Sequence, residues 1–257
     1  MNFLNTHTPN PVAFQAFGIN IMWYGILIAL GIMLAGVVAY KRAPIHDIIR
    51  EKTLDILIVS VLFGVIGARL YYVVFNWSQY SGELLQIINL RQGGLAIHGG
   101  LIFGFLAAYI ICRIYGYRPL NVFDLFVPGV VLAQAIGRWG NYFNMEAHGG
   151  PTELPWAILV DGQLVHPTFL YESLWCLAVF IILVFIDNRR TFHGETFLCY
   201  GILYSLGRFF IEELRTDSLM LGGFKQAQVL SAVVFVVFLT FYVLQKISAR
   251  NKDKIFY

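Results

Sequence analysis

Long apolar stretches separated by short polar segments run along almost the whole chain. Seven of them approach the roughly 20 residues that a helix needs to cross a bilayer. They lie at residues 19–40, 53–75, 95–115, 122–143, 168–186, 195–214 and 226–246. Small residues inside these stretches favour close helix packing in lipid. The pattern predicts an all-α, polytopic integral membrane protein of about seven transmembrane helices, in which residues 1–257 form a single domain.

The segments between the apolar stretches are short, and the two longest, residues 76–94 and 146–167, fall on the same side of the expected membrane. Residues 84–90 fit a short interfacial helix. The stretch PWAILVDGQLVHP predicts two short strands around Asp161-Gly162, because Asp-Gly is a preferred hairpin turn. We therefore expect a small loop region on that side.

Lysine and arginine are distributed unequally between the two sets of loops. One set holds twelve of them, and the opposite set holds only Arg91, Arg215 and Lys225. Because cytoplasmic loops carry the excess of basic residues, we expect the N-terminus outside and the C-terminus in the cytoplasm. The first 18 residues contain no Lys or Arg, unlike a cleaved signal peptide, so the first span is expected to be retained.

Composition agrees with a membrane location. The chain is 58% hydrophobic and 13% charged, whereas roughly a quarter of the residues of a soluble domain are charged. The net charge of +3 follows from the loop asymmetry, and we expect no nucleic-acid partner. Cys112, Cys176 and Cys199 lie in or beside apolar stretches without metal-ligand spacing, which predicts buried free thiols.

Three arginines, Arg69, Arg138 and Arg208, lie inside the expected helices, where charged residues usually face a bundle interior or a wet cavity. At 1.5 Å per residue, each lies roughly 20–25 Å from the cytoplasmic start of its helix. Three helices that run the other way carry polar residues in their first turns: Tyr24, His98 and Glu172. We therefore expect all six side chains at one depth, just below the outer surface.

These arginines have a structural and a functional interpretation. A single arginine at this depth can simply extend to the lipid headgroups. Three at matched depth favour a site for an anionic lipid, because guanidinium binds phosphate bidentately. The polar residues are densest in GRWGNYFNMEAHGG, residues 137–150, where Arg138 and Asn141 are i, i+3 neighbours.

Two further motifs extend this pattern. Tyr204, Arg208, Glu212 and Arg215 are spaced to form one helical face, on which we expect Glu212 to neutralise its arginine neighbours. His98 lies between glycines in GGLAIHGG. It is either a hydrogen-bonded packing residue or a group that moves a proton near neutral pH.

Together these motifs resemble the prolipoprotein diacylglyceryl transferases of bacteria. GRWGNYFNMEAHG is similar to the signature of that family, and GGLAIHGGLIFG is similar to its histidine motif. WYG, GARLYYV, HPTFLYE and YSLGRFFIEELR match in the same order, so the resemblance runs from about Trp23 to Arg215. Phe169 departs from the pattern, since many members have glutamine there.

The resemblance implies a transferase that moves the diacylglyceryl group of phosphatidylglycerol to the thiol of a lipobox cysteine in a prolipoprotein. It implies release of glycerol 1-phosphate, in the first step of lipoprotein maturation, at the outer face of the bacterial plasma (inner) membrane. The single domain would then be catalytic. The matching positions tied to activity or lipid binding are His98, Arg138, Asn141, Glu146, Gly149, Tyr24, Tyr204 and Arg208.

The implied reaction assigns roles to these residues. A neutral thiol has a pKa near 8.5, so a base is expected; His98 is the candidate, with Glu172 or Glu146 as alternatives. Arg138 and Arg208 would stabilise the departing phosphate. The expected substrate-binding set is Arg138, Asn141, Glu146, Gly149, Tyr24, Tyr204 and Arg69. No cofactor or metal is expected, because the phosphate is already a leaving group.

Two other classes of protein remain open from the sequence. A transporter or channel for an anionic solute would also use intramembrane arginines, but it would need polar residues across the whole membrane depth. A non-catalytic membrane interaction protein would not need a buried polar cluster. The cytoplasmic halves of the expected helices are nearly uncharged, which favours a site confined to the outer side.

Overall fold

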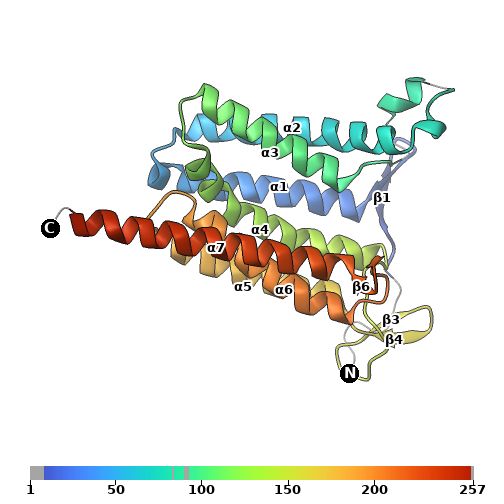
Figure 1. Ribbon diagram of the computed structural model, residues 1–257. Coiled ribbons are helices and arrows are strands. Elements are labelled where there is room, and N and C mark those ends of the chain that lie inside the picture. The colour runs from blue at the N-terminus through green and yellow to red at the C-terminus, as the bar shows by residue number, and fades with distance from the viewer. Residues whose placement is uncertain (1–8, 83, 90–92, 256–257) are drawn as a thin grey trace. The chain divides into compact units, whose positions relative to one another are not determined.

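The computed structural model describes residues 9–82, 84–89 and 93–255. Most of them are helical (Figure 1). The long helices are α1 (Trp23–Arg42), α2 (Arg50–Phe75), α3 (Ile97–Ile114), α4 (Pro119–Phe143), α5 (Thr168–Asp187), α6 (Glu195–Leu214) and α7 (Gln226–Ile255). A helix therefore lies at each of the seven positions that the apolar stretches predicted.

Six helices in the described part of the chain are long and apolar enough to cross a membrane, namely α1 to α5 and α7. Helix α6 is not among them, since every 18-residue stretch of it contains three charged residues. The chain is thus a mostly helical, multi-pass membrane protein. The charges of α6 belong to a polar cluster described below.

The first apolar stretch is divided between a strand and a helix, so the expectation of a helix from residue 19 was wrong. Strand β1 (Val12–Ala16) pairs antiparallel with β2 (Ile19–Met22), and α1 begins only at Trp23. The turn between the strands is formed by Phe17 and Gly18, both with positive φ. Hydropathy did not separate this apolar hairpin from the helix that follows it.

The hairpin predicted around Asp161-Gly162 is confirmed. Strand β3 (Ile158–Val160) pairs with β4 (Gln163–Val165), and Asp161 and Gly162 have φ of 48° and 80°, as a tight two-residue turn requires. Phe169, which departs from the family pattern, is buried against this hairpin. A third hairpin, β5 (Met220–Leu221) with β6 (Phe224–Lys225), was not predicted.

Short 3₁₀ helices occupy several of the connections: η1 (Ala43–His46), η2 (Trp77–Gln79) and η3 (Leu84–Ile88). Helix η3 corresponds to most of the short helix expected at residues 84–90. Leu90 and Arg91, which entered the sequence predictions, lie outside the described residues.

The chain forms two compact units, and each is described by itself. The first contains the residues up to Val38 and those from Phe123 onward, and the second is Ala39–Val122. The expectation of one domain over residues 1–257 stays a prediction. In the first unit α4, α5 and α6 share a core that includes Val131, Cys176 and Leu183.

Close backbone contacts hold the helices of the first unit together. A Cβ atom on Gly129 of α4 would lie 2.7 Å from the carbonyl oxygen of Ala35 on α1, and one on Gly201 of α6 would overlap the ring of Phe238 on α7. Helices α5, α6 and α7 run alongside one another in Figure 1. All three cysteines are buried and free, as predicted.

In the second unit α2 and α3 pack through a stripe of small residues. A Cβ atom on Gly64 would lie 3.4 Å from the carbonyl oxygen of Gly100, and one on Gly104 would lie 3.3 Å from that of Ser60. The close packing predicted from these glycines is therefore confirmed. It brings the first turn of α3, which carries His98, against the later part of α2.

Candidate active site

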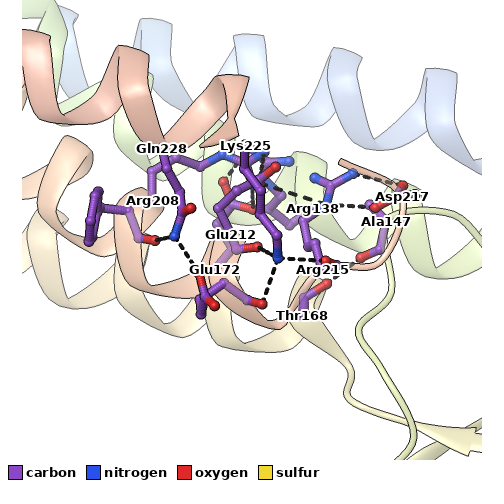
Figure 2. Close-up of polar contacts among 12 residues, drawn as sticks. Arg138, Ala147, Thr168, Glu172, Arg208, Glu212, Arg215, Asp217, Lys225 and Gln228 are labelled. Atoms are coloured by element: carbon purple, nitrogen blue, oxygen red, sulfur yellow. Dashed lines mark hydrogen bonds and ion pairs between the residues drawn. The ribbon is translucent and has the colours of Figure 1, made fainter. Parts of the chain in front are cut away.

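A buried carboxylate lies between two arginines in the first unit. Glu172, in the first turns of α5, is only 3% exposed. Its Oε1 lies 2.5 Å from Nη2 of Arg138 on α4, and its Oε2 lies 3.0 Å from Nη1 of Arg208 on α6. Figure 2 shows the three side chains converging from their helices. Three segments far apart in the sequence thus form one ion-pair network.

The polar face of α6 continues this network. Nη2 of Arg208 lies 2.6 Å from Oε2 of Glu212, one turn further along the helix. The Tyr204 hydroxyl accepts a hydrogen bond from Nη2 of Arg138 at 3.3 Å and donates one to Glu172 at 3.4 Å. The prediction of one helical face is confirmed for Tyr204, Arg208 and Glu212, with Glu212 neutralising an arginine. It was wrong for Arg215, which follows the last residue of α6 in extended backbone.

Both arginines keep part of their hydrogen-bonding capacity. Nε and Nη1 of Arg138, and Nε of Arg208, form no hydrogen bond with any described residue. The two side chains are 22% and 16% exposed, whereas that of Glu172 is 4% exposed. Because guanidinium presents five N–H donors in a fixed plane, each can bind a further anionic oxygen without leaving Glu172.

The chain beyond α4 folds back around Glu146. The side-chain amide of Asn141 donates to Oε1 of Glu146 at 2.9 Å, and that of Asn144 donates to the same oxygen at 3.3 Å. Met145 and Ala147 adopt left-handed backbone conformations, which turn the chain sharply between them. The Ala147 carbonyl accepts a hydrogen bond from the Thr168 hydroxyl at the start of α5. The signature stretch therefore begins as the last turns of α4 and continues, after Phe143, as a compact turn fixed by its own amides.

Gly149 lies where three backbone segments meet. Its N–H donates to the His166 carbonyl at 2.9 Å, and the N–H of Gly150 donates to the Leu214 carbonyl at 3.0 Å. A Cβ atom on Gly149 would lie 2.7 Å from Cβ of His166 and 2.8 Å from the Leu214 oxygen. This glycine allows the signature turn to contact both the end of α6 and the residues just before α5.

Tyr24 extends the site to the start of α1. Its ring packs on Gly140, where a Cβ atom would lie 2.4 Å from the ring. The neighbouring Trp23 stacks on Phe143 at the end of α4, with ring centroids 5.0 Å apart. The Tyr24 side chain is therefore held beside the signature stretch, against a glycine two residues beyond Arg138.

The end of α6 is fixed by two residues that the sequence did not single out. Nζ of Lys225 donates to the carbonyls of Glu212, Glu213 and Arg215 at 2.7–3.0 Å. Asp217 accepts hydrogen bonds from Nε and Nη2 of Arg215 at 2.9 and 2.8 Å. The Gly222-Gly223 pair is a hairpin signal that would have predicted the return of Lys225 to this helix end.

The Arg215–Asp217 pair lies beyond the last residue of α6. Burial by itself would raise the pKa of Asp217, but the hydrogen bonds and charge of Arg215 outweigh it and hold that pKa below its usual value. Nε of Arg215 lies 3.9 Å from the same Glu212 oxygen that Arg208 contacts at 2.6 Å. The role of Arg208 as the cation that meets a ligand stays a prediction.

His98 and Arg69 belong to the second unit. His98 is the second residue of α3, beside Gly99, whose Cβ position would lie 2.3 Å from the carbonyl oxygen of Gly67 on α2. The glycine next to His98 therefore allows the start of α3 to pack closely on α2. Arg69, in contrast, is 6% exposed and donates only to backbone carbonyls. The expected convergence of these two residues with Arg138 and Arg208 stays a prediction.

The network of Arg138, Glu172, Tyr204 and Arg208 defines the class of protein. A cationic cluster within a bundle of apolar helices can bind an anionic group at membrane depth. Within residues 9–82, 84–89 and 93–255, no three His, Cys, Asp or Glu residues are grouped as metal ligands would be. The chain is a multi-pass membrane protein with a buried polar site.

Comparison with known proteins identifies the family. Residues 11–244 match the family model described as prolipoprotein diacylglyceryl transferase. A phosphatidylglycerol–prolipoprotein diacylglyceryl transferase of Clostridioides difficile (strain 630) is 51% identical over 244 residues, which cover 95% of this chain and 98% of that protein. Proteins of the same name from Finegoldia magna and Staphylococcus aureus are 50% and 44% identical. The alignment with the Finegoldia magna protein covers 88% of this chain and 91% of that protein. The alignment with the Staphylococcus aureus protein covers 93% of this chain and 90% of that protein. The chain belongs to the prolipoprotein diacylglyceryl transferase family and is an enzyme of the transferase class.

Proposed function

We propose that this protein transfers the diacylglyceryl group of phosphatidylglycerol to the thiol of a lipobox cysteine and releases glycerol 1-phosphate. One observation carries the proposal: guanidinium groups from α4 and α6 share the Glu172 carboxylate and retain free N–H donors. The names of the relatives supply the substrates. The same cluster gives the chemistry a physical basis, because guanidinium groups bind phosphate through strong, often bidentate, charge-assisted hydrogen bonds.

The reaction proceeds by displacement at carbon. The cysteine sulfur attacks the glycerol carbon that is bonded to the phosphate oxygen, a C–S bond forms, and the C–O bond breaks. The bonding electrons leave with the phosphate, and the thiol proton passes to a base. Charge therefore accumulates on the phosphate during the step, and Arg138 and Arg208 stabilise it there.

His98 is the base that we propose. Both oxygens of Glu172 are engaged by arginines, so a proton accepted there would disrupt two ion pairs. Glu146 accepts from two amides through one oxygen, which suits a role in fixing the signature turn. His98 is exposed at the start of α3, and its imidazole is the side chain suited to moving a proton near neutral pH.

The remaining residues orient the lipid in this proposal. The Tyr204 hydroxyl, between Arg138 and Glu172, and the Tyr24 ring on Gly140 lie beside the phosphate and its glycerol. Asn141 helps to orient the lipid by fixing the turn around Glu146. Gly149 does so by allowing close backbone contact between the start of α5 and the end of α6. Arg69 does not belong to this group, because its guanidinium donates to backbone carbonyls.

We further infer that α6 crosses the membrane, which gives seven spans with the N-terminus outside and the C-terminus in the cytoplasm. Its Arg208 and Glu212 pair with each other, and Arg208 also pairs with Glu172, whose other oxygen pairs with Arg138. Two positive and two negative charges thus balance inside the bundle, which is compatible with a spanning helix. Twelve basic residues in one set of loops against three in the other support this orientation. The polar site then faces the outside of a bacterial plasma membrane.

Purified protein in phosphatidylglycerol vesicles, supplied with a lipobox peptide, tests the proposal directly. We expect mass spectrometry to show one diacylglyceryl group on the peptide cysteine and an equal amount of glycerol 1-phosphate released. A peptide with serine in place of the cysteine and vesicles of phosphatidylcholine are the controls. A peptide that stays unmodified in the presence of the lipid would contradict the proposed function.

A further inference from the structure

Arg69 uses every donor of its guanidinium group on the backbone of one loop. Nε donates to the Ile87 carbonyl at 2.7 Å. Nη2 donates to those of Gln86 and Asn89 at 2.6 and 3.0 Å, and Nη1 to those of Gly93 and Gly94 at 2.8 and 3.0 Å. Five N–H groups meet five carbonyl oxygens, which is the full capacity of arginine.

This arrangement differs from those of Arg138 and Arg208. Both of them pair with carboxylates and keep N–H groups that no described residue uses, whereas Arg69 forms no ion pair with a described acidic residue. Its charge is stabilised by carbonyl dipoles and by the ring of Tyr80, 5.1 Å away. No N–H group of Arg69 remains for a phosphate.

The loop that Arg69 holds leads directly into the helix that carries His98. Gly93 and Gly94 both have positive φ, and a Cβ atom on Gly94 would lie 2.4 Å from Nη1 of Arg69. The N–H of Ala96, the residue before α3, donates to the Ala68 carbonyl on α2 at 3.0 Å. Three residues separate the last held carbonyl from His98, so the position of this loop limits where the first turn of α3 can begin.

We infer that Arg69 is a positioning residue: it holds residues 86–89 and 93–94 against α2 and thereby fixes the start of α3 and His98, rather than contacting the lipid. Irregular backbone at membrane depth needs internal partners for its polar groups, and one guanidinium supplies five of them. Lysine cannot replace it, since an ammonium group has three donors and no planar fork.

The inference rests on the proposed function only for the role of His98. Its structural part is tested by amide hydrogen exchange of the full-length protein in nanodiscs. We expect Arg69→Lys to speed exchange at residues 86–89 and 93–96 by about tenfold or more, because local opening becomes easier. Arg113→Lys is the matched control: it changes an arginine near the end of α3 whose side chain has no partner among the described residues, and exchange should stay as in the wild type.

The functional part is tested by steady-state transfer to a lipobox peptide and by binding of phosphatidylglycerol. We expect Arg69→Lys to lower kcat by about tenfold or more, while KM and the Kd for the lipid stay within about twofold of wild type. Arg138→Lys should instead raise that Kd. A tenfold rise in Kd for Arg69→Lys with unchanged exchange in the loop would overturn the inference. A wild-type protein without transfer activity would refute the proposed function and leave the exchange result to decide the role of Arg69.

Discussion

Glu172 of α5 and Arg138 of α4 form a buried ion pair with 2.5 Å between Oε1 and Nη2. The second oxygen of the same carboxylate pairs with Arg208. Together with Glu212, which also pairs with Arg208, this carboxylate balances two cations that would otherwise be costly to bury. It also holds the two guanidinium planes in place before any lipid arrives, which is the preorganisation that transition-state stabilisation requires.

The first prediction concerns Glu172. Glu172→Gln removes the charge shared by Arg138 and Arg208, and we expect the free energy of unfolding to fall by about 3 kcal/mol, as for other broken buried ion pairs. Thermal unfolding in detergent measures the loss. Phosphatidylglycerol should restore more stability to the variant than a diacylglycerol with the same acyl chains does, because only the former has a phosphate that can replace the missing anion; equal restoration by both lipids would contradict this account.

The second prediction separates charge from geometry at Arg138. Arg138→Lys keeps the charge but loses the planar fork, and we expect kcat/KM for transfer to fall by about 10²-fold, in the range for loss of one transition-state donor. Arg190→Lys, which changes an arginine paired with Asp187 at the far end of α5, is the control and should keep wild-type activity. Wild-type turnover and lipid affinity in Arg138→Lys would rule out a bidentate clamp.

The third prediction tests the proposed base. His98→Gln keeps a polar side chain of similar size but cannot accept the thiol proton, so we expect the single-turnover rate to fall by about 10²-fold or more. The variant should also lose the dependence of that rate on pH near neutrality. An unchanged rate and pH profile in rapid-quench measurements would remove His98 from this role.

The fourth prediction uses two adjacent glycines. Gly149→Ala places a methyl group 2.7 Å from Cβ of His166, and we expect a loss of about 1–3 kcal/mol in stability, typical of overpacking. Gly150→Ala is the matched control, since its nearest neighbour, Cγ2 of Thr216, would be 3.7 Å away. Thermal unfolding of both variants measures the difference in stability. An equal loss of stability in the two variants would show that the backbone at Gly149 is not closely packed.

The fifth prediction concerns pH and the Arg215–Asp217 pair. The pKa of Asp217 is lower in the folded protein than its ordinary value of 3.8. The stability that this shift contributes is therefore present above about pH 4 and is lost as the pH falls through the folded-state pKa. Asp217→Asn should be less stable than wild type at pH 7, with the gap closing in acid. A gap that is constant from pH 7 to pH 3 would contradict the shift.

The sequence predicted the helices better than it predicted their boundaries. Bilayer thickness imposes a length on apolar stretches, and a helix lies at each of the seven predicted positions, six of them long and apolar enough to cross a membrane. Strand β2 was missed because Ile19–Met22 is as apolar as the helix that follows, and hydropathy carries no information on whether such a run pairs with a neighbouring strand. The third hairpin was missed for a different reason, since the Gly222-Gly223 turn signal was present in the sequence and was not used.

For the site, the depth argument correctly grouped Arg138 and Arg208 with Glu172, because membrane depth can be counted along each helix. The same argument placed Arg69 with them. Depth does not reveal how many donors a guanidinium has already used, and that count separates Arg69, with five backbone acceptors, from Arg138. The number of donors already in use follows only from the atomic positions in the folded chain.

The central claim is that Arg138 and Arg208 hold the phosphate of the lipid. The most direct measurement compares the affinities of the protein for phosphatidylglycerol and for a diacylglycerol with the same acyl chains, which lacks the phosphate. We predict that wild type prefers phosphatidylglycerol, and that a variant with both Arg138→Lys and Arg208→Lys loses most of this preference while its affinity for diacylglycerol is unchanged. A double variant that keeps the full preference would contradict the claim.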